Sequence, residues 1–569
     1  MVAWNHLTFL HGNSMNQVEV QTPRVSIFTA LVPILVLIGL LGINVYLFGA
    51  DSSSGPNQIA LLLAAAAAAT AGFGLKVPFA HMLGGIKKAI GSALTAMLIL
   101  LLIGSLAGTW MMSGIVPAMI YYGLDILNPK IFLFASAVVC AIVSVASGSS
   151  WSTVATVGIA LLGIGSALGI NEAFAAGAII SGAYFGDKIS PLSDTTNLAA
   201  AMAGTDLIRH INYMLWTTIP SFSIALAIYL AIGYSGETTA LVTDTSALKA
   251  EVLSHFDTLS PALLLVPFVV LVLVLFKFDA IAALFVGAVL GGLIAIAFQP
   301  SMVTQIAGLE DETTTNPETK EVTNAPPSYL KRSYVAFVNA MAFETLGVSS
   351  DDTDVAKADL RAGKLASAQR QTGKPDLTQK EFDELDLKLE ETFPKLEAKV
   401  AAAKLLKGKG MNGMLNTIWL IITAMCFGGI MESCGFLRRI TEPLVAMSHS
   451  NGALVATTAG SCMFVNATAS DQYLAIVVPG QMFRETFEER DLAPENLSRT
   501  LEDSGTVTSV LVPWNTCGAA QSGVLGVDVL LYAPYCFFNW ISPLMTIAVG
   551  FAGIGIAKLN SHDSSDSAT

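Results

Sequence analysis

The stretch Gly186–Asn197, GDKISPLSDTTN, places two aspartates, a lysine and a run of hydroxyl and amide side chains inside an apolar part of the chain. Pro191 has no backbone N–H to donate, and it disfavours a helical conformation at Ser190 before it. We therefore expect a helix to end here and the chain to unwind. Non-helical backbone is tolerated at membrane depth only where it is buried in protein or lines a wet cavity. The stretch thus predicts a broken membrane helix beside a cavity.

The composition of the whole chain agrees with a membrane location. Of 569 residues, 53% are apolar and only 13% are charged, whereas about a quarter of the residues in a typical soluble domain are charged. Residues 300–410 alone hold 15 basic and 18 acidic residues, so the rest of the chain is poorer still in charge. The net charge of −13 leaves no basic surface that would bind nucleic acid, and that class of partner is excluded.

Hydropathy predicts an all-α polytopic membrane protein with about 10–12 membrane helices, each of about 20 mostly apolar residues. Eight runs have this character: 25–49, 57–75, 89–109, 208–233, 261–277, 279–298, 412–431 and 529–557. Four further stretches are apolar but interrupted by small and polar residues: 131–169, 173–205, 453–483 and 500–526. We interpret these four as re-entrant hairpins and broken helices.

The chain reads as two similar halves, 25–234 and 261–557. Leu-Val-Pro at 31–33 recurs at 265–267, and Ser190–Leu192 matches Ser509–Leu511 at an offset of 319. A polar insert, 300–410, interrupts only the second half. An odd number of crossings in each half would turn the second over, which gives the inverted repeats common among secondary transporters.

The distribution of Lys and Arg in short loops predicts the orientation. It places the amino-terminal tail, 1–24, in the cytoplasm and the insert 300–410 outside, with a second tail at 558–569. Within the insert, apolar residues at helical spacing from Thr378 to Leu406 predict a small helical cap. We expect an integral protein of the cytoplasmic (inner) membrane.

Ionisable residues inside membrane spans are costly to bury and are functional candidates by default. They are Asp187, Lys188 and Asp194 in the first half and Glu432, Asp471, Glu502 and Asp503 in the second. The seven histidines fall in loops, tails or span ends, so a transported proton would have to ride on a carboxylate. Burial raises the pKa of a carboxyl group and a bound cation lowers it, so one site can exchange a proton for a metal ion.

Polar residues at corresponding places in the two halves complete the candidate site. Ser149 and Ser150 in the first half, and Asn466 and Asp471 in the second, are predicted hairpin tips. The polar stretch that contains Asn515 and Thr516, after Pro513, is the second predicted break. Simpler interpretations remain: a polar loop at the membrane surface, hydroxyls bonded to helix carbonyls, and a Glu432 side chain that reaches out near the end of its span.

The string Gly186–Asn197, with Gly-Thr-Trp at 108–110 and Ser-Gly at 113–114, resembles the signature region of the NhaC family of Na+/H+ antiporters. The resemblance covers 25–300 and 411–557, and the insert 300–410 departs from the family pattern. It implies the ion-transporter superfamily fold of inverted repeats, paired hairpins and broken helices. It also implies a set of ion-site or gating residues: Asp187, Ser190, Asp194, Thr195, Thr196 and Asn197. The Na+ ligands among them would be Asp194, Thr195 and Asn197.

Other functions are left open by the sequence. The NhaC family is similar to proteins that exchange malate for lactate, and helix amino termini and hydroxyls can hold a carboxylate without Arg or Lys. Amino-acid transport and a passive channel are further alternatives. No metalloprotease, nucleophile-elbow or phosphate-loop motif points to an enzyme. We expect no cofactor beyond Na+ as a transported ion, membrane lipid as surroundings, and a homodimer.

Overall fold

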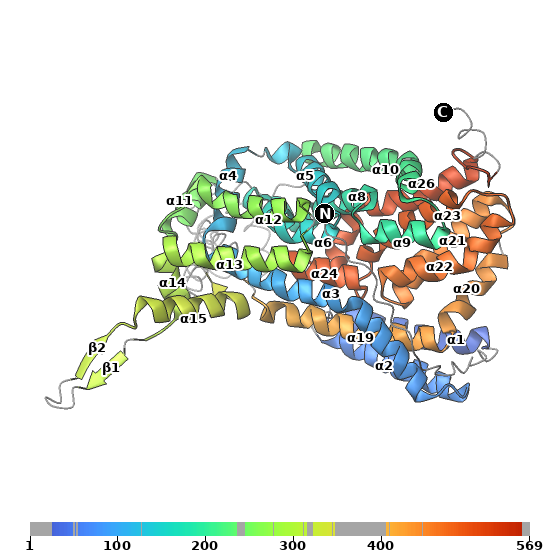
Figure 1. Ribbon diagram of the computed structural model, residues 1–569, viewed down its shortest axis with the longest axis horizontal. Coiled ribbons are helices and arrows are strands. Elements are labelled where there is room, and N and C mark those ends of the chain that lie inside the picture. The colour runs from blue at the N-terminus through green and yellow to red at the C-terminus, as the bar shows by residue number, and fades with distance from the viewer. Residues whose placement is uncertain are drawn as a thin grey trace, which may run out of the picture.

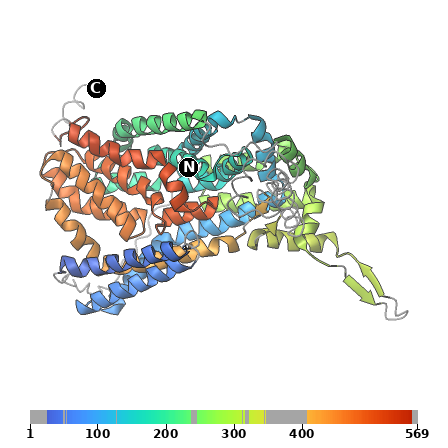
Figure 2. The same cartoon turned by 180° about the vertical axis from the view of Figure 1, so that it is seen from behind.

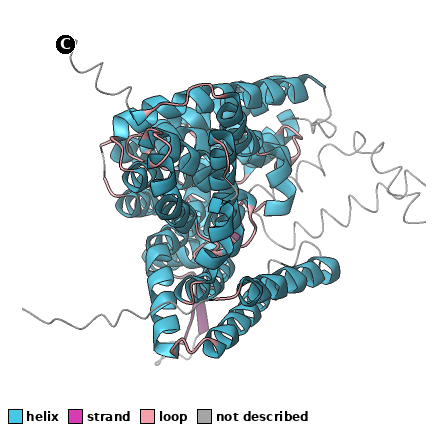
Figure 3. Cartoon of the chain, turned by 90° about the vertical axis from the view of Figure 1, so that its right-hand side faces the viewer, coloured by secondary structure: helices cyan, strands magenta, loops and turns pink. Residues whose placement is uncertain are grey.

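The computed structural model is built almost entirely of helices (Figures 1 and 3). It describes residues 25–48, 52, 55–126, 128–235, 245–276, 278–310, 312–315, 322–343, 345–346, 406–408, 410–446 and 448–559. The predicted amino-terminal tail, most of the carboxy-terminal tail and the predicted helix from Thr378 to Leu406, except Leu406 itself, lie outside these residues.

The first half runs from α1 to α10. Its helices are α1 (Ile27–Phe48), α2 (Pro56–Gly74), α3 (Phe79–Met112), α4 (Ile115–Ile126), α5 (Phe132–Ser147), α6 (Ser150–Thr153), α7 (Ile159–Ala167), α8 (Glu172–Ile189), α9 (Asp194–Ala203) and α10 (Leu207–Ser235). A π-helical turn, η3 (Val154–Gly158), joins α6 to α7, and the 3-10 turn η2 (Pro129–Ile131) precedes α5.

The second half begins after α11 (Thr245–Ser254). Its helices are α12 (Leu265–Leu275), α13 (Ala280–Phe298), α14 (Pro300–Ala307), α15 (Tyr329–Ala342), α19 (Leu415–Ser433), α20 (Phe436–Ala446), α21 (Asn451–Thr468), α22 (Gln472–Glu488), α23 (Pro494–Leu501), α24 (Thr516–Leu525), α25 (Val529–Tyr532) and α26 (Phe537–Ala552). Short turns intervene: η4 (Pro261–Leu264), η6 (Asn412–Met414), η7 (Glu502–Thr506), η8 (Ser509–Leu511) and η9 (Ala533–Tyr535).

Eight helices in the described part of the chain are long and apolar enough to cross a membrane, and a bent pair at 529–552 would make a ninth. Six of the eight runs predicted from hydropathy contain such a span, the run 261–277 contains a shorter apolar helix, and the run 529–557 contains the bent pair. The other two spans, Pro129–Ser147 and Ser150–Ala167, overlap the interrupted stretch 131–169. Large apolar side chains on the outer faces of the membrane helices are exposed, among them Phe28, Tyr46, Trp216 and Leu544. Such a surface is stable against lipid tails but not against water, so the chain is a polytopic membrane protein.

The two halves are structural repeats. Residues with positive φ recur at an offset of 322: Gly148 with Ser470, Gly169 with Asp491, and Gly204 with Gly526. The match of Ser190 with Ser509 at 319 is therefore out of register by three residues. Ser190 already lies in the unwound segment after α8, whereas Ser509 still lies in the turn η8.

The long helices α3 and α19 are equivalent elements of the two repeats and lie side by side (Figures 1 and 2). A Cβ atom added at Gly85 would lie 2.4 Å from the carbonyl oxygen of Gly429, and one at Gly104 would lie 2.2 Å from that of Gly410. As residue numbers rise along α3 they fall along α19, so the two helices run antiparallel. The second repeat is thus inverted relative to the first.

The insert 300–410 contains elements that its sequence pattern does not predict. Its described part holds α14, α15 and two antiparallel strand pairs, β1 (Glu312–Thr315) with β2 (Val322–Ala325) and β3 (Thr345–Leu346) with β4 (Lys407–Gly408). The β1–β2 pair projects from one end of the molecule (Figure 1). Ser105 Oγ on α3 donates to the carbonyl oxygen of Met341 at 3.1 Å, so α15 is held against a membrane helix.

Candidate functional site

The tips of two hairpins lie at one cavity. Hairpin 1 is α5 with α6–α7, and hairpin 2 is α21 with α22. Each turns on a residue in the left-handed region, and the next residue caps the second arm. Ser149 Oγ accepts the N–H of Ser152 at 3.2 Å, and Asp471 Oδ1 accepts that of Leu474 at 2.9 Å. Both tips therefore present helix amino termini, where backbone N–H groups are unpaired.

Two unwound segments lie beside these tips. Break 1 (190–193) separates α8 from α9, and break 2 (512–515) separates η8 from α24. Ser190 Oγ donates to the carbonyl oxygen of Val145 on hairpin 1 at 2.8 Å. In break 2, Asn515 caps α24 by accepting the N–H of Cys517 at 3.0 Å, and its amide donates to Asn466 Oδ1 on hairpin 2 at 3.1 Å. Each break is thus tied to the hairpin of its own repeat.

The hairpin tips and break 1 enclose the first cavity, of about 430 Å³. Five predicted site residues line it: Ser149, Asp187, Asp194, Asp471 and Thr516. Asp279, at the start of α13, is a fourth aspartate in the lining, and Trp151 and Tyr473 supply aromatic rings. Among the described residues that line this cavity there is no Lys, Arg or His.

Asp187 is held by the tip of hairpin 1. Its Oδ2 atom accepts two hydrogen bonds from Ser150, one from the backbone N–H at 3.1 Å and one from the hydroxyl at 2.7 Å. Oδ1 has no hydrogen-bond partner within the described structure, although the residue is only 6% exposed. A buried carboxylate oxygen without a donor is an available ligand for a cation or a proton.

Asp194 is held from both repeats. Its Oδ2 atom accepts the hydroxyl of Tyr473, on hairpin 2, at 2.5 Å, and its Oδ1 atom accepts the N–H of Thr195 at 2.9 Å. Thr516, next to Asn515, lines the same cavity, and its N–H donates to the carbonyl oxygen of Ser470 at 2.9 Å. Thr516, the first residue after break 2, therefore reaches the same cavity as break 1.

Comparison with known proteins identifies the family. The model of the Na+/H+ antiporter family matches residues 182–324 and 391–554. An Na+/H+ antiporter NhaC of Alkalihalophilus pseudofirmus is 35% identical over 477 residues, which is 84% of this chain and 85% of that protein. The chain belongs to the Na+/H+ antiporter family.

Relatives within this family of antiporters differ in their named substrates. A malate-2H+/Na+-lactate antiporter of Bacillus subtilis is 30% identical over 504 residues, 88% of this chain and 90% of that protein. An arginine/ornithine antiporter of Halobacterium salinarum is 32% identical over 534 residues, 93% of each chain. Family membership therefore establishes an antiporter but leaves the choice of substrate to the site.

Other predicted residues of this antiporter lie beside the cavity but do not line it. Thr195 Oγ1 donates to Glu502 at 3.1 Å, and Thr196 Oγ1 donates to the carbonyl oxygen of Lys188 at 2.9 Å. Asn197 donates back to the carbonyl oxygens of residues 191 and 193 at 3.1 and 2.6 Å. Of the predicted Na+ ligands, only Asp194 lines the cavity, while Thr195 and Asn197 hold the break in shape.

Glu432 lies in a different cavity, of about 1110 Å³, between the start of α3 and α20 and α22. Its Oε1 atom is 2.9 Å from Lys88 Nζ, and the two side chains are 27% and 73% exposed. Glu432 is thus partly exposed and lies one residue before the end of α19. This position fits the simpler interpretation, in which its side chain reaches toward the surface.

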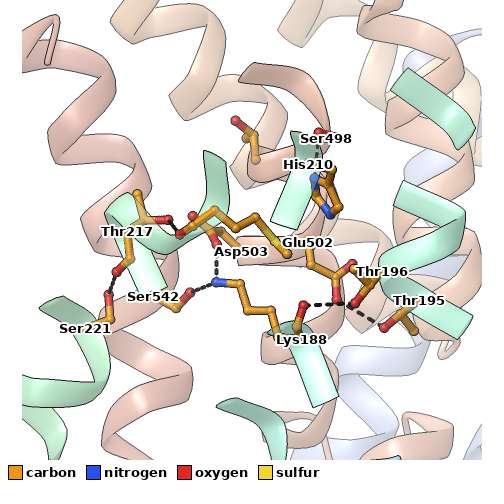
Figure 4. A network of polar contacts seen from close by, with 12 residues as sticks. Lys188, Thr195, Thr196, His210, Thr217, Ser221, Ser498, Glu502, Asp503 and Ser542 are labelled. Carbon is orange, nitrogen blue, oxygen red and sulfur yellow. Dashed lines mark hydrogen bonds and ion pairs between the residues drawn. The ribbon is translucent and has the colours of Figure 1, made fainter. Parts of the chain in front are cut away.

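A buried ion pair outside the lining of the first cavity joins the two repeats of the antiporter. Lys188 Nζ is bonded to Asp503 Oδ1 in the turn η7 and to Ser542 Oγ on α26, the latter at 3.0 Å (Figure 4). Neither charged side chain is exposed. The sequence marks Lys188, Glu502 and Asp503 as ionisable residues within spans, but their pairing across 315 positions needs the tertiary structure.

No group of three or more His, Cys, Asp or Glu side chains in the described ranges is close enough together to hold a metal ion. The six cysteines are free thiols, five of them buried. The aspartates that line the cavity are thus arranged around a space and are not gathered at one point.

Proposed function

We propose that this antiporter exchanges Na+ for H+ by alternating access, with the first cavity as the ion site. The observation that supports the proposal is the lining: four aspartates and no basic side chain among the described residues. Charge of one sign at the wall of a low-dielectric cavity attracts the opposite sign. A cation is therefore the species that this cavity favours.

The chemistry of exchange follows from Asp187. The two Ser150 hydrogen bonds hold Oδ2 in place, while Oδ1 has no hydrogen-bond partner within the described residues and the side chain lines the cavity. A dehydrated Na+ ion needs oxygen ligands in place of water, and carboxylate, hydroxyl and backbone oxygens at the tips and break 1 supply them. A bound Na+ ion favours the charged form of the carboxyl group, and a bound proton removes that charge. Na+ and H+ therefore compete for the same carboxylate. Competition at one site couples the two fluxes without simultaneous binding.

An organic anion is less well suited to this lining. Lys188 is next to Asp187 in sequence, but its ammonium group is bonded to Asp503 and it does not line the cavity. A dicarboxylate in the first cavity would meet aspartates without a neutralising cation. Exchange of malate for lactate therefore ranks below cation exchange.

A cationic amino acid is the second candidate substrate. The cavity of about 430 Å³ is far larger than a single Na+ ion requires, and Trp151 and Tyr473 line it together with the aspartates. A guanidinium group stacks on aromatic rings and pairs with carboxylates. The same lining would thus also accept arginine.

The remaining expectations belong to the same proposal. The protein would act without covalent catalysis and without a cofactor, in the cytoplasmic (inner) membrane and with its amino terminus in the cytoplasm. Membrane lipid and a second copy of the chain would be its partners. The support for this orientation is the bias of Lys and Arg among the short loops.

The test is a transport assay in proteoliposomes with an imposed pH gradient. Na+, malate with lactate, and arginine with ornithine are offered separately, and dissipation of the gradient is followed with a pH-sensitive dye. Dissipation by Na+ alone is the expected result. Strict exchange of an anion or of arginine, without any response to Na+ alone, would overturn the primary proposal.

Variants connect the activity to the cavity. Asp187→Asn keeps an acceptor for the Ser150 donors but removes the charge, so Na+-dependent dissipation is expected to disappear while the protein stays folded. The matched control is Asp125→Asn, which removes an exposed aspartate paired with Lys249 outside the cavity. Equal loss of activity in both variants would show that the effect is not specific to the cavity.

A further inference from the structure

A second, smaller cavity of about 250 Å³ lies against α19. Asn416, Thr417, Pro513, Ser522 and Asp528 are among the residues that line it. Of the lining residues on α19, Asn416 is exposed, whereas Thr417 and Leu420 are buried. The second cavity thus has both exposed residues and Pro513 of break 2 in its lining.

The two cavities occupy equivalent positions in the two repeats. The α3 residues that line the first cavity include Ser92, Thr95, Ala96 and Ile99. The residues of η6 and α19 that line the second are Gly413, Asn416, Thr417 and Leu420. Each pair differs by 321 positions. Because the second repeat is inverted relative to the first, the operation that maps the first cavity onto the second also exchanges the two sides of the membrane. The two cavities therefore approach the centre from opposite sides.

Close packing surrounds the second cavity at α24 and at break 2. A Cβ atom at Gly523 would lie 2.5 Å from Thr417 Oγ1, so α24 and α19 are in close contact there. Trp514, in break 2, donates its indole N–H to the carbonyl oxygen of Ala467 on hairpin 2 at 2.7 Å. Its equivalent in break 1 is Leu192, which is 38% exposed and lines the open first cavity.

We propose that the second cavity is the other mouth of the transport pathway, and that the bond from Trp514 to Ala467 is the latch that closes it. This proposal depends on the proposed function in one respect: it assumes that the protein transports a substrate, whichever substrate that is. In the alternate state, hairpin 2 and break 2 separate at this bond, and the substrate leaves past Ser522. Movement of one repeat against the other would at the same time close the first cavity.

Cysteine accessibility tests the position of the mouth. Ser522→Cys and Ser92→Cys are each reconstituted, and a membrane-impermeant thiol reagent is added to one side of the vesicles at a time. The labelled residue is identified by mass spectrometry, because Cys517 lies one turn from Ser522. We expect Cys at 92 to react from one side only and Cys at 522 from the opposite side only. Reaction of both from the same side, or no reaction at 522, would overturn the proposal.

The latch is tested by Trp514→Phe, which keeps an aromatic ring and removes the N–H. The initial rate of labelling at Ser522→Cys is expected to rise roughly two- to tenfold, the factor that loss of one neutral hydrogen bond corresponds to. The matched control is Trp540→Phe, because the Trp540 indole donates to the carbonyl oxygen of Ala533 away from the break. An equal rise in both variants, or none in Trp514→Phe, would refute the latch.

The cysteine labelling and the Na+ transport assay can fail independently of each other. Labelling from opposite sides requires no assumption about the transported species. If Na+ is not transported but position 522 reacts only from the side opposite to position 92, the second mouth stands and the substrate is wrong. If Na+ is exchanged but both positions react from one side, the second mouth is wrong and the substrate stands.

Discussion

The buried pair of Lys188 and Asp503 is expected to contribute strongly to holding the two repeats together, and a double-mutant cycle measures that contribution. Lys188 is on α8 of the first repeat and Asp503 in η7 of the second, and both side chains are completely buried. Ser542 accepts a further bond from the ammonium group at 3.0 Å, and the ring of Phe538 lies 5.6 Å from Nζ. Either single substitution would leave its partner charge buried without its counter-ion.

The size of the effect follows from this burial. Removal of one partner of a buried pair costs about 3–5 kcal/mol, because the other charge stays desolvated. Lys188→Met and Asp503→Asn are each expected to lower the free energy of unfolding by that amount. The double variant removes both charges, so its cost should be no larger than that of either single variant. The coupling energy is then about 3–5 kcal/mol.

The assay is equilibrium unfolding in mixed detergent micelles, followed by the fluorescence of the seven tryptophans. The control cycle is Lys88→Met with Glu432→Gln, a pair at 2.9 Å whose side chains are 73% and 27% exposed. Coupling in that pair should be about 0–1 kcal/mol. Additive single effects at Lys188 and Asp503, or equal coupling in both cycles, would refute this reasoning.

Two further predictions concern the hairpin tips and break 2. Gly148→Ala should destabilise the protein by about 1–2 kcal/mol or more, because φ is +67° and the new Cβ atom would lie 2.5 Å from that of Leu192. Ser470→Gly, at the equivalent tip with φ +61°, should leave the stability unchanged or raise it. Thermal unfolding checks both, and a shift of the same sign in the two variants would contradict the argument. Asn515→Ala removes the cap of α24 and the bond to Asn466, at a cost of about 0.5–2 kcal/mol for the cap alone; unchanged thermal stability would contradict it.

The pattern of apolar runs predicts the membrane helices because a span must be apolar over its whole length. The interrupted stretches predict the hairpins and breaks for a related reason: Pro191 and its polar neighbours cannot continue a helix in lipid. Charge at membrane depth is rare, so the sequence indicates Asp187, Asp194 and Asp471 as candidate site residues. Each of these inferences depends on local composition alone.

The register of the repeat could not be read from short identities. Ser190 and Ser509 match in sequence but lie on different sides of their breaks. The true correspondence appears in backbone conformation, where Gly148 and Ser470 share a left-handed φ although their side chains differ. Conformation is conserved between the repeats where residue identity is not.

What the sequence by itself determined is a protein of the membrane with two halves, each broken by polar segments that carry acidic residues. Only the tertiary structure decided which of those acids share a cavity. It placed Glu432 beside Lys88 in another cavity, directed Thr195 toward Glu502, and paired Lys188 with Asp503. A buried charge needs a partner because burial without one is costly, but this cost does not determine which residue the partner is. The partner depends on how the helices pack, since it can lie hundreds of positions away in the sequence.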